Sequence, residues 1–77
     1  MKKVKIYSTP TCPWCRKAKS YLEDKGVEFE DVDVSRDHEA QHEMVEKSGQ
    51  MGVPVLDIKG RIIVGFDQNA IEQALAV

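Results

Sequence analysis

The stretch Ser8-Thr9-Pro10-Thr11-Cys12-Pro13-Trp14-Cys15 contains both cysteines of the chain and joins an expected strand to an expected helix. Two thiols at this spacing can close a disulfide with each other, so the protein can accept and donate electrons without a cofactor. A C-x-x-C pair beside a β-α-β pattern is typical of a dithiol redox site. The sequence therefore predicts thiol–disulfide chemistry at Cys12 and Cys15.

The pattern of apolar residues around this stretch predicts an α/β fold with the element order β-α-β-α-β-β-α. The expected elements are a strand over 3–7, a helix over 13–25, a strand over 27–34, a helix over 35–48 capped by Ser35, strands over 54–58 and 61–64, and a helix capped by Asp67. In the second strand the apolar phase slips between Phe29 and Val32, which predicts a bulge or twist. Lys59-Gly60 predicts a hairpin turn between the last two strands.

These elements assemble most simply into a four-stranded mixed sheet with three helices, in one domain over residues 1–77. The first two strands are joined by a helix and are therefore expected to be parallel. The cysteine pair then lies at the carboxyl end of the first strand, the edge where open α/β sheets bind ligands.

Composition excludes several other classes of function. The net charge of −2 over 77 residues provides no basic surface for nucleic acid, and no run approaches the ~20 apolar residues of a membrane span. Met1-Lys2-Lys3 is followed by Val4-Lys5-Ile6 rather than by the apolar run of a secretory signal. We expect a cytoplasmic monomer without nucleic-acid or membrane partners, in which a disulfide is transient.

The two cysteines are expected to have different roles. Pro13 favours the first helical position, which makes Cys12 the N-cap and turns its sulfur toward the N–H groups of Trp14 and Cys15. The positive end of the helix dipole favours a thiolate there. Cys15 lies one turn further on and is expected to be buried. We therefore expect Cys12 to attack a substrate disulfide and Cys15 to resolve the mixed disulfide.

Two further residues have alternative interpretations. Trp14 either forms an exposed contact for the partner or packs as an ordinary aromatic residue. Met51 precedes Gly52-Val53-Pro54 and either lines the site or fills the interior. Pro54 stands where a strand begins, a position that tolerates proline, and the residues alone favour a trans bond before it.

The chain resembles a glutaredoxin-like protein of the thioredoxin-fold superfamily along essentially its whole length. The resemblance rests on Ile6-Tyr7-Ser8 ahead of Cys12-Pro13-Trp14-Cys15, on Gly52-Val53-Pro54, and on a Gly65-containing turn before the last helix. It implies that Pro54 is cis beside the dithiol and that the Val53 backbone pairs with the bound thiol substrate in the manner of a strand.

The resemblance also implies a thiol–disulfide oxidoreductase acting on protein disulfides or glutathione mixed disulfides. No tightly bound cofactor is implied, and glutathione is the implied co-substrate. The implied substrate-contact residues are Thr11, Pro13, Trp14, Met51, Val53, Pro54, Gly65, Phe66 and Asp67.

Two departures from the family pattern affect the expected reductant. Many glutaredoxins have Lys where this chain has Thr9, and Gly65-Phe66-Asp67 replaces a Gly-Gly turn. Gln50 is the candidate for the basic or polar residue that is common ahead of Val53-Pro54. A comparable Gly-Phe turn occurs in redoxins that thioredoxin reductase reduces and that serve ribonucleotide reductase. Those redoxins usually lack proline after the first cysteine. Glutathione and thioredoxin reductase both stay open as the electron donor.

A second motif suggests another chemistry. His38-Glu39-Ala40-Gln41-His42 matches the H-E-x-x-H pattern of zinc proteases. Such a protease also needs a third ligand and a substrate cleft, for which 77 residues committed to another fold leave little room. The acidic neighbours of this motif indicate the solvated face of a helix. We predict no metal site. The competing class is a non-enzymatic carrier of metal or an iron–sulfur cluster that uses the two cysteines.

Overall fold

The computed structural model describes residues 4–76 and contains seven elements in the predicted order. They are β1 (Val4–Ser8), α1 (Pro13–Asp24), β2 (Glu30–Asp33), α2 (His38–Ser48), β3 (Val55–Ile58), β4 (Arg61–Val64) and α3 (Gln68–Leu75). The predicted α/β class with a mixed four-stranded sheet and three helices is confirmed. The predicted start of the first strand at Lys3 lies outside the described residues.

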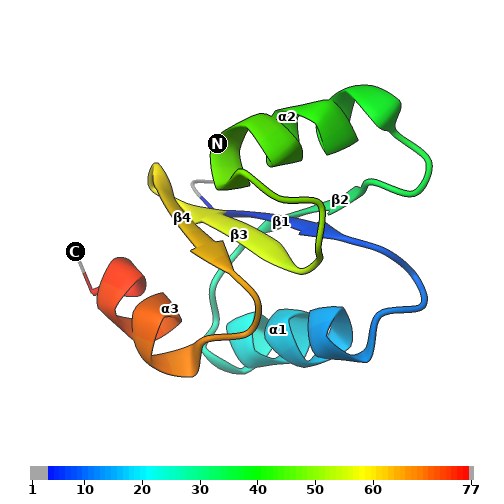
Figure 1. The fold of residues 1–77 in the computed structure, drawn as a ribbon. Helices are drawn as coiled ribbons and strands as arrows, with labels where there is room; N and C mark the ends of the chain where they lie inside the picture. Colours follow the sequence, from blue (N-terminus) through cyan, green and yellow to red (C-terminus); the bar gives the residue numbers. More distant parts are fainter. Residues whose placement is uncertain (1–3, 77) are drawn as a thin grey trace.

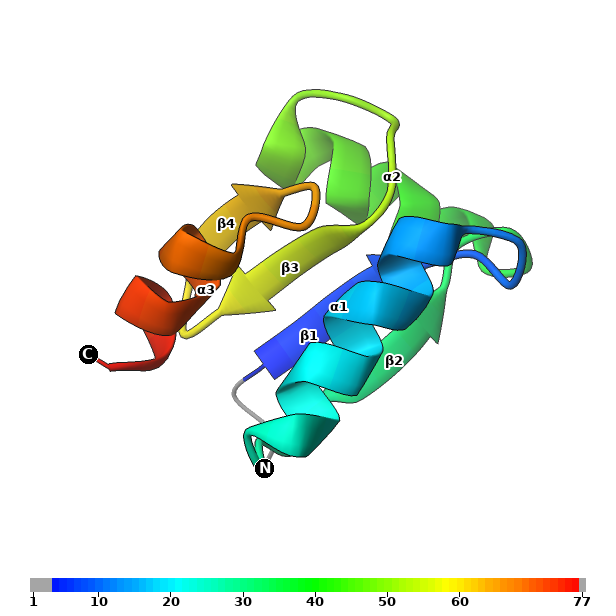
Figure 2. The same cartoon turned by 90° about the horizontal axis from the view of Figure 1, so that it is seen from below.

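The sheet has the strand order β2-β1-β3-β4. β1 runs parallel to β2 and antiparallel to β3, and β3 and β4 form an antiparallel hairpin that turns at Lys59-Gly60. Helix α2 covers one face of this sheet, while α1 and α3 lie side by side on the other (Figures 1 and 2). The carboxyl end of β1 therefore leads directly into the loop before α1, as predicted.

Each face of the sheet buries its own apolar cluster because successive strand residues point to opposite sides. The cluster on the face of α1 and α3 consists of Val4, Ile6, Ala18, Leu22, Leu56, Ile58, Ile63, Ile71 and Ala74. The cluster under α2 consists of Tyr7, Val34, Ala40, Met44 and Val55. In α1, Ala18 and Leu22 follow Cys15 on a single buried stripe, so packing of this stripe holds the active-site helix against the sheet.

The second strand was predicted over 27–34, and this prediction is wrong for residues 27–29, which precede β2. Gly26 has φ of 71°, and the Val27 N–H donates to Leu22 O at 3.0 Å, so these residues close the end of α1. Val27 and Phe29 still pack against the core, which explains their alternation without a strand. β2 pairs with β1 in continuous register from Glu30 to Asp33, without the predicted bulge.

The predicted N-cap of α2 is also wrong. Asp37, not Ser35, caps the helix, because its carboxylate accepts the Ala40 N–H at 3.0 Å. Ser35 lies in the preceding turn, where its N–H donates to Asp33 Oδ1 at 2.9 Å. Asp67 caps α3 as predicted and accepts the Ala70 N–H at 3.1 Å.

The part of the chain that the structure describes contains no helix with the length and apolar character needed to cross a membrane.

Candidate functional site

Cys12 is the N-cap of α1, as the position of Pro13 predicts. Its sulfur accepts the Cys15 N–H at 3.2 Å, and its thiol lies 3.8 Å from the carbonyl oxygen of Val53. The expected contact with the Trp14 N–H is not found among the described hydrogen bonds. The Cys12 side chain is partly exposed. Its sulfur is thus accessible, sits at the positive end of a helix and faces a backbone acceptor across the site.

Cys15 lies directly behind Cys12 and is fully buried, as expected. Burial raises the pKa of the Cys15 thiol, and the hydrogen bond with Cys12 raises it further. A backbone hydrogen bond with Thr9 and the charge of Lys19 act in the opposite direction. An external disulfide therefore meets Cys12 first, and Cys15 is reached only through it.

The wall opposite the cysteines is Val53-Pro54, which leads into β3. The peptide bond before Pro54 is cis, as the family resemblance implies and as the residues alone did not predict. The Gly65 N–H donates to Pro54 O at 2.8 Å and ties the turn after β4 to this wall. Gly65 has φ of 80°, a conformation that glycine adopts without strain. This hydrogen bond holds the next residue, Phe66, near the Val53-Pro54 wall.

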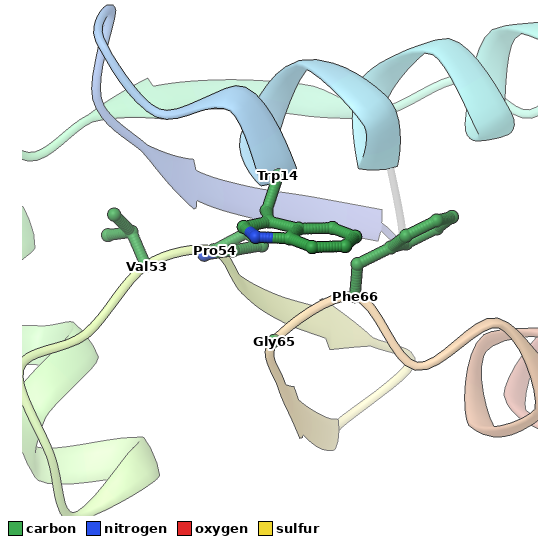
Figure 3. Close-up of a pocket in the computed structure, with 5 residues that line it drawn as sticks. All are labelled: Trp14, Val53, Pro54, Gly65 and Phe66. Atoms are coloured by element: carbon green, nitrogen blue, oxygen red, sulfur yellow. The ribbon is translucent and has the colours of Figure 1, made fainter.

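A pocket of about 290 Å³ opens beside the Val53-Pro54 wall. It is lined by Trp14, Val53, Pro54, Gly65 and Phe66. In Figure 3 the indole of Trp14 extends from the start of α1 over Pro54, and the ring of Phe66 lies at the same level on the far side. Trp14 remains 56% exposed, which favours the interpretation as a surface contact. No charged side chain lines this pocket.

The pocket brings together five of the predicted contact residues and leaves four outside its lining. Met51 is 67% exposed and points to solvent, so it is not interior filler. Thr11 and Pro13 are exposed on either side of Cys12. Asp67 is exposed and uses its carboxylate as the N-cap of α3. Thr11 and Pro13 are the chain neighbours of Cys12, and none of these four residues lines the cavity.

The position that we identified for a polar ligand group, Gln50, is occupied by internal hydrogen bonds. Its side-chain amide donates to Gly52 O at 2.9 Å, and its side-chain oxygen accepts the Gly52 N–H at 2.6 Å. The residue thereby shapes the turn before Val53. Neither Gln50 nor Phe66 therefore offers a charged group to a ligand.

Two basic residues of α1 contact groups beside the dithiol loop. The Lys17 ammonium lies 4.5 Å from the centre of the Trp14 ring, and Arg16 Nη2 donates to Pro10 O at 3.1 Å. The three-residue spacing from Trp14 to Lys17 was the signal for the first contact, because residues this far apart lie on the same helix face. The contacts orient the indole and close the loop ahead of Cys12.

Residues 4–76 contain no group of three or more His, Cys, Asp or Glu side chains arranged to hold a metal ion. His42 lies on α2 with its side chain 77% exposed, and its Nε2 contacts Glu46 Oε1 at 3.0 Å. His38, also exposed, begins the same helix. Both histidines belong to α2, which covers the face of the sheet opposite to the one that α1 covers (Figure 1).

Known proteins resemble this chain in both sequence and structure. Residues 4–63 match the family model described as glutaredoxin. An uncharacterized glutaredoxin-like 8.6 kDa protein in the rubredoxin operon of Clostridium pasteurianum is 51% identical over 72 residues, covering 94% of this chain and 96% of that protein. Glutaredoxin 3 of Escherichia coli K12 is 37% identical over 67 residues, covering 87% of this chain and 81% of the relative.

The solved structure of the glutaredoxin-like protein NrdH-redoxin from Escherichia coli, described as having a thioredoxin-like activity profile, superposes with a TM-score of 0.81 at 29% identity. The match covers 95% of this chain and 93% of that one. The matched family model, these relatives and a dithiol at the start of α1 agree on thiol–disulfide oxidoreductase chemistry. The chain therefore belongs to the glutaredoxin family, within the thioredoxin fold.

Proposed function

We propose that the protein reduces disulfides of protein substrates and mixed disulfides of glutathione, with Cys12 as the nucleophile and Cys15 as the resolving thiol. The observation that carries this proposal is the difference between the two sulfurs: one caps α1 and is partly exposed, and the other is fully buried one turn behind it.

The reaction proceeds in two exchange steps. The Cys12 thiolate attacks one sulfur of the substrate disulfide, forms a mixed disulfide and releases the other substrate sulfur as a thiolate, which takes up a proton. Cys15 then loses its proton and attacks Cys12 Sγ. The Cys12–Cys15 disulfide forms, the second substrate thiol leaves, and two electrons have passed from the protein to the substrate.

The neighbouring residues have binding roles in this proposal. The Val53 carbonyl oxygen, 3.8 Å from Cys12 Sγ, marks the backbone edge along which the substrate cysteine lies. The pocket between Trp14 and Phe66 receives the residue next to that cysteine. Thr11, Pro13, Met51 and Asp67 contact the more distant parts of a protein substrate.

For the reductant we propose glutathione, which forms a mixed disulfide with Cys12 and is then displaced by a second glutathione. The alternative is a redoxin that thioredoxin reductase reduces and that supplies electrons to one enzyme, such as ribonucleotide reductase. Pro13 directly after the first cysteine favours glutathione, because such redoxins usually lack this proline. The apolar pocket wall at Phe66 and the internally bonded Gln50 favour the alternative. In either case the pair needs a reducing compartment, so the cytoplasm stays our prediction for its location.

Cys15→Ser tests the assignment of the two thiols. A protein with only Cys12 can exchange with glutathione mixed disulfides, because free glutathione resolves the intermediate, but it cannot resolve a mixed disulfide with a protein. We expect turnover of a glutathione mixed disulfide within a fewfold of wild type and at least about a hundredfold loss with a protein disulfide. Equal loss with both substrates would contradict the assignment. Cys12→Ser is the control and should abolish both activities.

A second measurement decides between the reductants. The oxidised protein is mixed either with glutathione and glutathione reductase or with NADPH and thioredoxin reductase, and NADPH consumption is followed. Turnover with the first system alone supports glutathione as the donor, and turnover with the second alone supports the redoxin alternative.

A further inference from the structure

A cluster of polar side chains lies behind the resolving cysteine, on the face of the sheet that α1 covers. Asp31 of β2 joins two other elements: one carboxylate oxygen accepts from the Ser8 hydroxyl at 2.7 Å, and the other contacts the Lys19 ammonium at 3.0 Å. Ser8 is 2% exposed, the single buried polar residue among those described. The cluster therefore holds Lys19, a residue of α1, in one place.

Lys19 follows Cys15 by four residues, so the two side chains are neighbours on the same side of the helix. The Lys19 side chain is only 24% exposed, although lysine usually extends into solvent. Its ion pair with Asp31 of β2 holds the Lys19 ammonium against the sheet, and Cys15 is fully buried on the side of α1 that faces this sheet.

A positive charge at the position of Lys19 can assist the second exchange step. Cys15 must become a thiolate before it can attack Cys12 Sγ, but burial and the neighbouring Cys12 raise its pKa. Once Cys12 is bound in a mixed disulfide, it carries no negative charge and no longer opposes ionisation of Cys15. Burial then remains the main obstacle, and the charge of Lys19 and the backbone of Thr9 counteract it.

We propose that Lys19, held by Asp31 and Ser8, is a positioning residue for the resolving step: its ammonium stabilises the Cys15 thiolate as Cys15 attacks the mixed disulfide. The proton lost by Cys15 passes through solvent to the departing substrate thiolate, so the balance of atoms and electrons is that of the exchange above. The inference rests on the proposed dithiol mechanism.

The test separates the two exchange steps within one experiment. The reduced protein is mixed with an equimolar amount of an aromatic disulfide whose thiolate is coloured. The first release of colour reports attack by Cys12. The second reports attack by Cys15 on Cys12 Sγ, and mass spectrometry verifies that the product is the intramolecular disulfide.

We expect Lys19→Met to slow the second release roughly fivefold at neutral pH, the size of effect for one partly exposed charge. The first release should stay within about twofold of wild type. The pH profile of the second release should shift to higher pH by about 0.7 unit, because a fivefold change in the thiolate fraction corresponds to that shift of the Cys15 pKa. Lys19→Arg keeps the charge and should restore most of the rate.

The groups that bear on this pH profile are Cys12 at the N-cap of α1, Lys19 on that helix and the Thr9 backbone in the loop before it. On the strands beneath they are Ser8, Asp31 and Asp33, whose carboxylate also interacts with the charge of Lys19. On the same face β3 contributes the apolar residues Leu56 and Ile58. Lys25→Met is the matched control, because it removes an equal charge and an ion pair from the far end of α1, where Lys25 contacts Glu72 at 3.2 Å.

A second release from Lys19→Met with the rate and pH profile of wild type would overturn the inference. So would a slowing that Lys25→Met reproduces. The proposed function fails in a different way: the wild-type protein itself would show no second release or would form no intramolecular disulfide.

Discussion

Glu43→Gln tests the polar cluster that joins α2 to the sheet beneath the active-site loop. Glu43 accepts the Tyr7 hydroxyl at 2.6 Å and contacts Lys47 Nζ at 2.9 Å, and Lys47 also contacts Asp57 at 2.9 Å. Tyr7 is fully buried and stands two strand positions before the loop that begins at Thr9. Glutamine preserves the shape of the side chain and an oxygen acceptor, so the variant removes mainly the negative charge.

The loss of stability expected for Glu43→Gln follows from the ionisation of the Glu43 carboxylate. Hydrogen bonds from Tyr7 and then Lys47 lower the pKa of Glu43 from its ordinary 4.5 to about 2. One pKa unit corresponds to about 1.4 kcal/mol. If the whole shift of the Glu43 pKa contributed to the free energy of unfolding, it would amount to about 3 kcal/mol. The side chain is 43% exposed, and solvent screening reduces the expected value to about 1–2 kcal/mol.

The sign of the pH dependence is determined by the lowered pKa. The stabilisation is complete above pH 4.5 and is lost as the pH falls from 4.5 toward 2, where the folded protein also takes up the proton. Because glutamine does not titrate, Glu43→Gln should be less stable than wild type at pH 7, and the difference should vanish near pH 2.

Urea unfolding followed by circular dichroism at several pH values measures this difference. Glu46→Gln is the matched control: Glu46 belongs to the same helix, its side chain is 69% exposed, and its contact is with His42. We expect the control to change stability by less than about 0.5 kcal/mol. Glu43→Gln as stable as wild type at pH 7, or a deficit that persists unchanged at pH 2, would refute the reasoning.

Two further substitutions test the corrected cap and the pocket. Asp37→Ala removes the acceptor for the Ala40 N–H and should lower the free energy of unfolding, measured in urea, by about 1 kcal/mol. Asp37→Asn should retain most of the stability. If Asp37→Ala were as stable as wild type, Asp37 would not be the residue that caps α2. Phe66→Ala removes one wall of the pocket and the edge contact of this ring with Tyr21, whose centroids are 5.7 Å apart. We expect KM for a protein disulfide to rise about fivefold with kcat nearly unchanged, and an unchanged KM would remove Phe66 from the binding surface.

The local features of the site could be predicted from the sequence because neighbouring residues create them. Proline at position 13 begins the helix, which makes Cys12 its N-cap and directs the first sulfur to the Cys15 N–H. The spacing of Cys15, Ala18 and Leu22 places the second sulfur on the buried stripe of the same helix. The hairpin and the cap at Asp67 are equally local.

The errors arose where two local interpretations were nearly equivalent. Ser35 and Asp37 are both residue types that favour an N-cap. In the structure Ser35 belongs to a turn in which its N–H donates to Asp33, so the helix begins after Asp37 instead. Val27 and Phe29 alternate like strand residues, but the closing turn of α1 removes the Val27 N–H from any ladder. Their apolar side chains pack against the core without forming part of a strand.

The sequence by itself determined the chemistry of this protein: a dithiol at a helix start and a fold that places it at the edge of a sheet. Only the tertiary structure decided what surrounds the dithiol. Trp14 and Phe66 meet across one pocket, and Lys19 meets Asp31, although each pair is separated along the chain. The physical reason is that a helix cap depends on adjacent backbone groups, whereas a pocket wall or a tethered charge depends on how whole elements pack across the sheet.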